Sequence, residues 1–315
     1  MKTTVLCIGD ANIDVILRTR FPPRGKQVVI SDYQVYGGGC ATNFALACSR
    51  LGASVRLIGK IGKDHWGAFL VEKLRKNKVD VSEMVISKYV KTGVTFAIIE
   101  DEERSFITFR GGNASLSIQD IPLKKLMANI VHIPSFFLVE SLRPHYAKLM
   151  KLARSRGAII SFDTGWDPFG LWRKTPHLLR TLQSTDVFLP NLDEARRITG
   201  RISEGPKKLA RRLLTMGPKI VCIKMGCRGS VVAEGTRVYR IPAFSVETVD
   251  STGAGDVYNA AFMLAYFKTR DVLRSARFAS AAAAISVTGP GWERYPYRSD
   301  VNGFLRTHGY APVDL

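Results

Sequence analysis

The sequence predicts an α/β fold built on a mostly parallel sheet, and three observations support this class. Short apolar, β-branched runs alternate with helical patterns along the whole 315-residue chain, as βαβ units require. These runs contain almost no polar residues, which is typical of strands that helices cover on both faces. Hydrophobic residues make up 46% and charged residues 23% of the chain, a composition that suits a large buried core.

The order of the elements follows from these patterns. Runs of Val, Ile and other apolar residues predict strands at residues 5–8, 55–58, 130–133, 158–162, 187–189 and 220–223. Apolar residues spaced by three and four predict helices at residues 43–51, 66–77, 143–155, 192–199, 206–215, 256–269 and 272–288.

Two stretches, 13–36 and 94–109, show strand-like alternation with no helix after them. We expect them to pair into a small β-sheet lid over the carboxyl edge of the main sheet, where open α/β folds bind ligands. An antiparallel extension without a lid role is the alternative. The strand edge at 94–99 also predicts pairing between two copies of the chain, and therefore a homodimer.

The chain is strongly basic, with 46 Lys and Arg against 27 Asp and Glu and a net charge of +19. Such a surface favours anionic partners, including nucleotides, phosphosugars and nucleic acid. The densest basic runs, 73–78 and 207–212, fall on helical patterns and are explained as solvated helix faces. Because no nucleic-acid motif or aromatic and basic platform accompanies them, we expect no nucleic-acid partner.

The cysteine pattern and the N-terminus predict the compartment. Five cysteines are an odd number without a CxxC pair, and no His/Cys cluster has metal-ligand spacing. No apolar run is long enough to span a membrane, and the apolar start is too short for a signal peptide. We therefore expect a cytoplasmic protein with reduced thiols and no membrane partner.

The segment that begins the predicted helix at 256–269 carries the strongest chemical signal. Gly253, Ala254 and Gly255 allow successive backbone N–H groups to turn toward one point, and the helix dipole adds positive charge there. Asp256 would repel an anion at that point unless it has another task, such as accepting a proton from an attacking hydroxyl. We interpret Asp256 as a general base; a helix-capping aspartate is the alternative.

Two earlier segments indicate a polyhydroxylated substrate. Gly38 and Gly39 precede a predicted helix, where glycines permit a close backbone approach to a ligand, and Asn43 offers both a donor and an acceptor. Asn12 and Asp14 follow the first strand and share one side of an extended chain, so they can hold adjacent hydroxyls. The alternative is that all these residues only cap helices or form turns.

These segments resemble the two signatures of the ribokinase-like (PfkB-type) carbohydrate kinase family, read here at 38–52 and 250–260. Supporting elements occur in the expected order at 59–67, 92–93, 112–113, 190–194 and 223–229, so the resemblance covers nearly the whole chain. It implies a three-layer, doubly wound fold in which residues 1–315 form a single kinase domain. It also implies phosphoryl transfer to a hydroxyl of a sugar or nucleoside.

The resemblance implies roles for individual residues. Asp256 would be the base, and Gly253, Ala254 and Gly255 would hold the charge of the transferring phosphoryl group. The substrate would contact Asn12, Asp14, Gly38, Gly39, Asn43 and Asn113. The nucleotide would contact Asn191, Glu194, Lys224, Gly226, Gly229, Gly253, Gly255 and Ser286.

Two cations are also implied by the resemblance. Asn191 and Glu194 match an element that organises Mg²⁺ through water, which is sufficient because Mg²⁺ keeps several waters and needs few carboxylates. A capping Asn with a surface Glu is the alternative. Asp250 and Thr252 match a loop that binds K⁺ in some members.

The chain departs from the family pattern at one loop. Relatives often carry Asp-x-Asn-x-Arg after a central strand, whereas this chain has Asp163-Thr164-Gly165-Trp166-Asp167. This change puts in doubt an anionic acid as substrate and one nucleotide contact. Trp166 and Trp172 can stack on a base or sugar, or belong to the core. The lid cations, which face a phosphosugar or only solvent, are Arg24, Lys26, Arg104 and Arg110.

We therefore expect an Mg²⁺-dependent kinase that transfers the terminal phosphoryl group of ATP to a hydroxyl of a small sugar. A nucleoside kinase is one alternative, since Phe44, Phe106, Phe136 and Phe137 can line a pocket for a base. A phosphosugar kinase, ADP as donor, a catalytically silent sugar- or nucleotide-binding protein, and a nucleic-acid binder driven by charge are the others.

Overall fold

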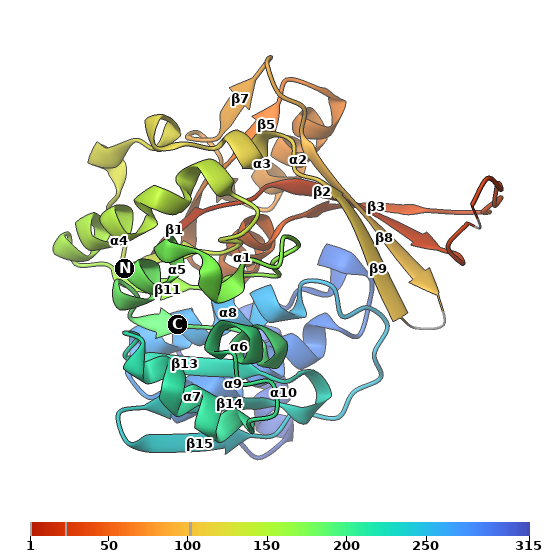
Figure 1. Ribbon diagram of the computed structural model, residues 1–315. Coiled ribbons are helices and arrows are strands. Elements are labelled where there is room, and N and C mark those ends of the chain that lie inside the picture. The colour runs from red at the N-terminus through yellow and green to blue at the C-terminus, as the bar shows by residue number, and fades with distance from the viewer. Residues whose placement is uncertain (1, 23, 101–102) are drawn as a thin grey trace.

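The computed structural model describes residues 2–22, 24–100 and 103–315, without the side chains of residues 103 and 104. A nine-stranded sheet runs through these residues (Figure 1) in the order β15-β14-β13-β12-β11-β10-β1-β4-β6. Its strands are β1 (Thr4–Ile8), β4 (Ser54–Ile58), β6 (Val79–Asp80), β10 (Ile130–Ile133), β11 (Ile159–Phe162), β12 (Val187–Phe188), β13 (Ile220–Lys224), β14 (Ser230–Glu234) and β15 (Arg237–Ile241).

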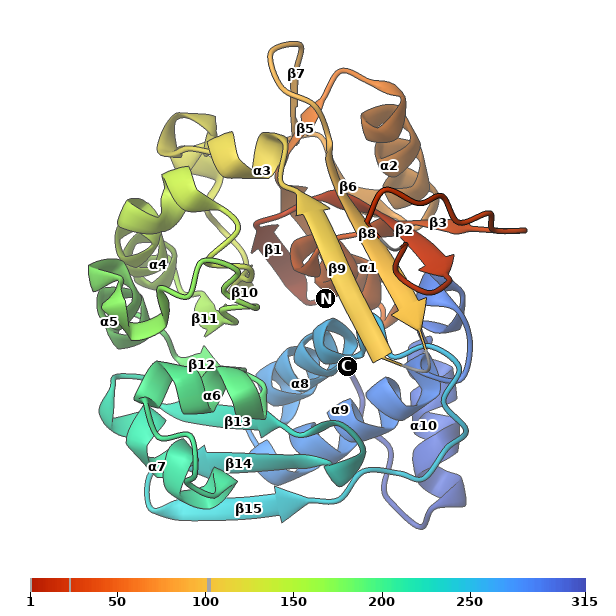
Figure 2. The same cartoon turned by 45° about the vertical axis from the view of Figure 1, so that its right-hand side comes forward.

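The strand pairing agrees with the predicted sheet. The strands from β13 to β6 pair in parallel, and β14 and β15 add an antiparallel hairpin at one edge. Figure 2 shows β12 to β15 following one another toward that edge. All four residues of β10 are buried, as expected for a strand with helices on both faces.

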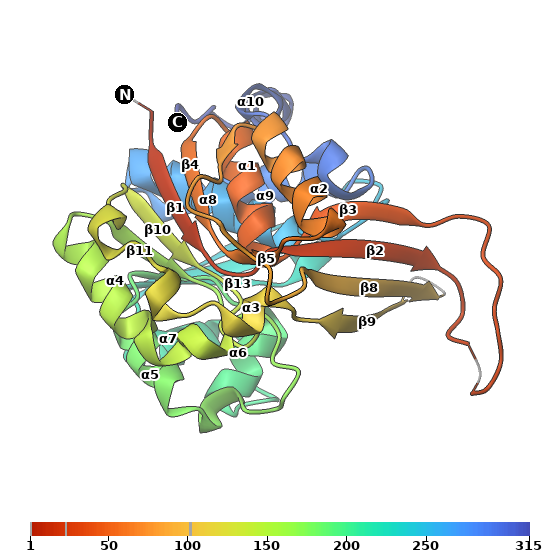
Figure 3. The same ribbon diagram turned by 90° about the horizontal axis from the view of Figure 1, so that it is seen from above.

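Helices cover the two faces of this sheet and separate the apolar core into two clusters. One face carries α1 (Cys40–Arg50), α2 (His65–Lys76), α8 (Ala254–Thr269), α9 (Val272–Ser286) and α10 (Arg298–Thr307). The other carries α4 (Tyr146–Ser155), α5 (Pro176–Gln183), α6 (Leu192–Thr199) and α7 (Pro206–Thr215). Figure 3 shows the sheet between these two groups, which confirms the three-layer α/β architecture.

A second, four-stranded sheet has the order β3-β2-β8-β9 and extends away from the main body (Figures 1 and 3). Its strands are β2 (Asn12–Arg18), β3 (Gln34–Gly38), β8 (Gly93–Glu100) and β9 (Glu103–Phe109). β2 pairs in parallel with β8, so two segments far apart in the chain share one sheet. Since β2 starts four residues after β1 ends, the second sheet begins at the carboxyl edge of the main sheet.

Small elements complete the fold and mark where sequence patterns were insufficient. β5 (Lys60–Gly62) pairs with β7 (Val85–Ser87), and α3 (Gly112–Ser115) is a single turn. Residues 140–145 form a 3₁₀ segment with Pro144 inside it, and because proline lacks an N–H, the α-helix predicted from residue 143 begins at Tyr146. The periodicity did not indicate α5, α10 or the β14–β15 hairpin.

Candidate active site

The first glycine turn lies against the end of β1. Asp10 accepts hydrogen bonds from the backbone N–H groups of Cys40 (3.1 Å) and Ala41 (3.0 Å), the first residues of α1. Gly39 caps α1 with φ of 89°, and a Cβ atom there would lie 2.8 Å from the Asp10 carbonyl oxygen. Only glycine suits both conditions. Sequence reasoning assigned no role to Asp10, whose one signal is its position just after the first strand.

The second glycine turn begins α8. Gly253 is the N-cap residue with φ of 74°, and a Cβ atom there would overlap the Tyr295 hydroxyl group. Within the helix, the N–H of Val257 is the first to bond one turn back, to the Gly253 carbonyl at 2.9 Å. The N–H groups of the preceding turn therefore lie at the positive end of a helix of 16 residues.

The two glycine turns meet at Asp256. The Asn43 side chain, in the first turns of α1, donates through Nδ2 to Asp256 Oδ2 at 2.9 Å. Asp256 is only 8% exposed, and this burial raises the pKa of its carboxyl to about 8. A carboxyl that titrates near neutral pH is suited to accept and release a proton.

Substrate-side residues predicted from the first strand gather beside these turns. Asn113 accepts the Ala11 N–H at 2.9 Å and donates through Nδ2 to Asn12 Oδ1 at 2.5 Å, and both side chains are buried. A Cβ atom on Gly38 would overlap the Asp14 carboxylate, so this glycine makes room for it. Burial, with the charges of Asp10 and Asp250, raises the pKa of Asp14 to about 7.

Lys224, at the end of β13, lies next to the first turn of α8. Its Nζ is 2.6 Å from Asp163 Oδ2 and 3.1 Å from Asn259 Oδ1. Asn259 also donates to Asp163 Oδ2 at 2.6 Å, which closes a buried triangle. Burial opposes the charged form of Lys224, but the Asp163 and Glu194 carboxylates outweigh it and raise the Lys224 pKa.

Asn191 and Glu194 form a reciprocal cap at the start of α6. Asn191 Oδ1 accepts the Glu194 N–H at 2.9 Å, while the two Glu194 oxygens accept the backbone and side-chain N–H groups of Asn191 at 2.8 Å each. Both earlier interpretations are partly right, because Asn191 caps the helix but Glu194 is only 4% exposed. Burial and the nearby Asp163 raise the pKa of Glu194 to about 8.

This corner fits a divalent cation. Asp163, Glu194 and Asp256 place three buried carboxyl groups around the single ammonium of Lys224, and the charges of Asp163 and Asp256 each disfavour ionisation of Glu194. Each Glu194 oxygen accepts one hydrogen bond from Asn191 and keeps a second lone pair for a metal-bound water. Mg²⁺ commonly binds in this water-mediated manner.

The remaining predicted residues lie around the same edge. Asp250 accepts the N–H groups of Thr252 at 2.9 Å and Gly291 at 3.1 Å, so it joins the anion-hole loop to the segment after α9. Gly226 and Gly229 flank a 3₁₀ turn after β13 with φ of 59° and 81°. The Ser286 hydroxyl bonds to the Ala283 carbonyl of its own helix at 2.8 Å.

A small cavity lies between the two glycine turns and the second sheet. The residues that line it are Asp14, Ile16, Tyr36, Gly37, Asn43, Thr252, Gly291, Trp292 and Tyr295. Sequence reasoning found Asp14, Asn43 and Thr252 but missed the three aromatic residues. The available signal for Trp292 and Tyr295 was two large aromatic residues in a glycine- and proline-rich segment at 289–296.

The loop that departs from the family pattern is held by aromatic and cationic contacts. Trp166 is 51% exposed, Trp172 is in the core, and the Arg197 guanidinium carbon lies 5.0 Å from the Trp166 ring centre. Arg110 pairs with Glu140 at 3.1 Å and lies over Phe169. Arg24 and Lys26 are exposed, and the Arg104 side chain lies outside the described part of the chain.

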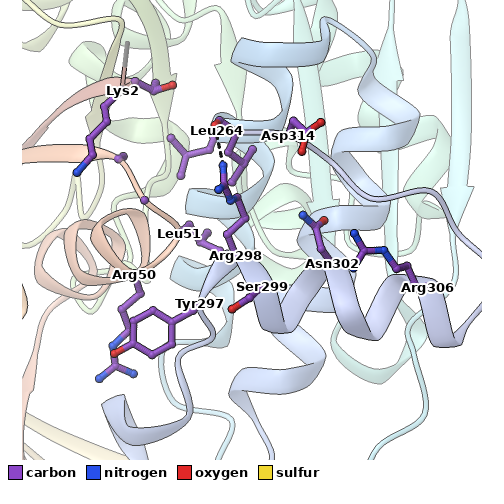
Figure 4. A pocket seen from close by; sticks show the side chains of 14 residues that line it. Lys2, Arg50, Leu51, Leu264, Tyr297, Arg298, Ser299, Asn302, Arg306 and Asp314 are labelled. Atoms are coloured by element: carbon purple, nitrogen blue, oxygen red, sulfur yellow. Dashed lines mark hydrogen bonds between the residues drawn. The ribbon is translucent and has the colours of Figure 1, made fainter.

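A larger cavity of about 940 Å³ opens at the amino ends of the strands (Figure 4). Lys2, Arg50, Arg298 and Arg306 line it together with Asp314. Two of the cations already have partners, because Arg50 donates to the carbonyls of the 292–295 segment and Arg298 to that of Leu315. None of the residues in the two glycine turns lines this cavity, so we do not assign the chemistry to it.

Comparison with known proteins gives matches along nearly the whole chain. Residues 2–295 match the pfkB family of carbohydrate kinases. Ribokinase of Bacillus subtilis is 27% identical over 306 residues, 96% of this chain and 99% of the relative. Nucleoside kinase of Methanothermobacter thermautotrophicus is 31% identical over 317 residues, 98% of this chain and 97% of the relative.

Solved structures agree with these sequence matches. Ribokinase from Thermotoga maritima superposes with a TM-score of 0.82 at 25% identity, covering 96% of this chain and 99% of the other. Arabidopsis thaliana ribokinase, complexed with ribose and ATP, superposes with a TM-score of 0.83 at 25% identity and the same coverage.

Fold, glycine turns and relatives together define the class of protein as a phosphotransferase that acts on an alcohol group. The chain belongs to the pfkB family of carbohydrate kinases, and within it to the sugar and nucleoside kinases. The predicted family and fold are thereby confirmed. Among the described residues, no helix combines the length and apolar character needed to cross a lipid bilayer.

Proposed function

We propose that this protein transfers the terminal phosphoryl group of ATP to a hydroxyl of a small sugar, with Asp256 as the general base. The observation that carries this proposal is the hydrogen bond between Asn43 and Asp256, which joins the two glycine turns at one buried carboxyl group. The resemblance to ribokinases, one of them complexed with ribose and ATP, supports the choice of substrate and donor.

On the acceptor side, Asn43 holds Asp256 Oδ2, which leaves Oδ1 to accept the proton of the attacking hydroxyl. The N–H groups of Gly253, Ala254 and Gly255, at the start of α8, stabilise the charge that develops on the transferring group. The other hydroxyls of the acceptor are held by Asn12, Asp14, Gly38, Gly39, Asn43 and Asn113, which lie beside the small cavity or directly behind it.

On the donor side, Lys224 and the turn with Gly226 and Gly229 contact the nucleotide, with Gly253, Gly255 and Ser286 along the adjacent helices. Asn191 and Glu194 would hold Mg²⁺ through water, and the ion would neutralise charge on the phosphates. Asp250 and Thr252 would hold K⁺ beside the anion hole. The Lys224 ammonium, fixed by Asp163, supplies a permanent positive charge at the end of β13.

The second sheet acts as a lid on residues 13–36 and 94–109 of one kinase domain that spans 1–315. Its position next to Asn12 and Asp14 allows it to close over a bound acceptor. Closure would exclude water, which otherwise competes with the sugar as the phosphoryl acceptor.

A nucleoside is the second candidate acceptor. The aromatic side chains around the small cavity, Tyr36, Trp292 and Tyr295, offer faces on which a base can stack. A nucleoside kinase is also 31% identical to this chain. Phe44, Phe136 and Phe137 do not contribute to this pocket, because all three are fully buried in the core. A phosphosugar acceptor and ADP as donor are outcomes of the same test.

The test is turnover of ATP or ADP with Mg²⁺ against a panel of sugars, sugar phosphates and nucleosides, using wild type and Asp256→Asn. We expect one responsive acceptor and a loss of kcat of about a thousandfold or more in the variant, with little change in KM for the nucleotide. Asp193→Asn, an exposed carboxyl on α6, is the matched control. Unchanged turnover in Asp256→Asn would exclude the proposed mechanism.

A further inference from the structure

A buried tryptophan from the end of the chain reaches the catalytic corner. Trp292 is 7% exposed, and its indole Nε1 donates to Asn43 Oδ1 at 2.8 Å. Asn43 in turn donates through Nδ2 to Asp256 Oδ2 at 2.9 Å. The three side chains therefore form a continuous hydrogen-bonded series from Trp292 to Asp256.

The direction of this series is determined by the chemistry of its first member. The indole N–H is a donor only, so the atom of Asn43 that faces Trp292 must be the amide oxygen. The amide nitrogen is then the atom that faces Asp256. In the flipped orientation, the amide oxygen would face the carboxylate and the amide nitrogen would face the indole N–H, and both contacts would be repulsive.

The backbone holds Trp292 firmly in this position. The Gly291 N–H donates to Asp250 Oδ2 at 3.1 Å, and the Trp292 carbonyl accepts from Arg50 Nη1 at 2.5 Å. A Cβ atom on Gly37 would overlap the indole ring, so that glycine provides the space for it. Anchors from α1, from β3 and from the anion-hole loop thus converge on one side chain.

We propose that Trp292 is a positioning residue, which fixes the Asn43 amide so that its N–H group faces and supports the ionised form of Asp256. This inference rests on the proposed role of Asp256 as the base. It concerns the residue that orients the machinery, and it assigns no chemical step to Trp292 itself.

Other charged or titratable groups near Asp256 come from separate elements and remain in place when Trp292 is changed. They are Asp10 after β1, Cys40 on α1, Asp163 after β11, Glu194 on α6, Lys224 on β13 and Tyr295 beside Trp292. A change in the titration of activity on substituting Trp292 therefore reports on the Asn43 contact.

The experiment compares the pH dependence of kcat for wild type, Trp292→Phe, Asn43→Ala and the double variant. Phenylalanine keeps an aromatic ring against Gly37 but removes the donor. We expect kcat at pH 7 to fall about tenfold, and the acid limb of the profile to move to higher pH by about one unit, because ionised Asp256 loses a fixed donor. KM for ATP should change less than about twofold.

The double variant separates positioning from a structural role. If Trp292 acts through Asn43, adding Trp292→Phe to Asn43→Ala produces no further shift of the acid limb. Trp66→Phe, on α2, controls for the loss of a tryptophan elsewhere. If kcat of Trp292→Phe falls equally at every pH, or if the two shifts add fully, the inference is wrong.

This outcome is distinguishable from failure of the proposed function. An inactive Asp256→Asn with an unshifted Trp292→Phe profile overturns only the role of Trp292. An active Asp256→Asn overturns the role of the base, and the Trp292 proposal with it. If Trp292→Phe does not fold, Asn43→Ala alone must still show the shifted acid limb, and an unshifted profile there also counts against the proposal.

Discussion

Lys224 and Asp163 form a buried ion pair, with Nζ 2.6 Å from Oδ2, although 61 positions separate them in the chain. The pair stands where the carboxyl ends of β11 and β13 meet. The Asp163 segment is the one that departs from the family pattern, and its first aspartate serves to hold the donor-side lysine.

Removing Asp163 should destabilise the protein. Asp163→Ala leaves the Lys224 ammonium and the Asn259 amide without their buried partner, which costs about 3 kcal/mol of unfolding free energy. Urea unfolding monitored by tryptophan fluorescence measures this. Asp193→Ala breaks an exposed pair with Arg196 and should cost less than about 0.5 kcal/mol. Equal stabilities for the two variants would contradict the structural importance of the pair.

Stability should decrease as the pH rises toward 8. The Asp256 pKa of about 8 in the folded protein is above its unfolded value of 3.8, so the folded state binds more protons between these values. Stabilisation from the protonated group is complete below the unfolded pKa and is lost as the pH rises through the folded pKa. Asp256→Asn removes this contribution.

Unfolding free energies of wild type and Asp256→Asn at pH values from 5 to 8.5 check this prediction. The variant should lose less stability than wild type across that range, because asparagine does not titrate. Glu194 and Asp14, whose pKa values are also raised, leave part of the dependence in the variant. Parallel curves for the two proteins would show that Asp256 is ionised throughout.

Gly253→Ala should abolish most activity. Residue 253 has φ of 74°, and a Cβ atom there would overlap the Tyr295 hydroxyl, so the start of α8 must move. We expect kcat to fall at least about a hundredfold through loss of the anion hole. The matched control is Gly303→Ala on α10, where a Cβ meets open space and alanine should stabilise the helix by about 0.5–1 kcal/mol. Similar effects at both positions would contradict this reading of Gly253.

The second sheet should mediate self-association. Phe96, Ile107 and Phe109 lie on one face of the β8–β9 pair, and each is at least 40% exposed. Such a patch on an open sheet indicates a protein partner, and we expect a second copy of this chain. Light scattering should give a dimer for wild type and a monomer for Ile107→Asp. Tyr89→Asp, exposed outside that sheet, should remain dimeric. A monomeric wild type would exclude the prediction.

Much of the fold was predictable because its elements are local patterns. The buried strands β1, β10 and β13 are nearly pure apolar runs, and α8 begins directly after its glycine turn. Elements with weaker patterns were missed. In α10 only three residues are buried, and the β14–β15 hairpin follows the glycine turn at 226–229 without a helix between.

The sequence alone determined the fold class, the family, the two glycine turns and Asp256 as the candidate base, because each depends on neighbouring residues whose spacing is printed in the chain. Only the tertiary structure decided which distant side chains meet. Trp292 lies 249 positions from Asn43, and no local pattern links them. Their contact exists because the segment after α9 returns to the start of α1, and that path depends on how the helices pack on the sheet.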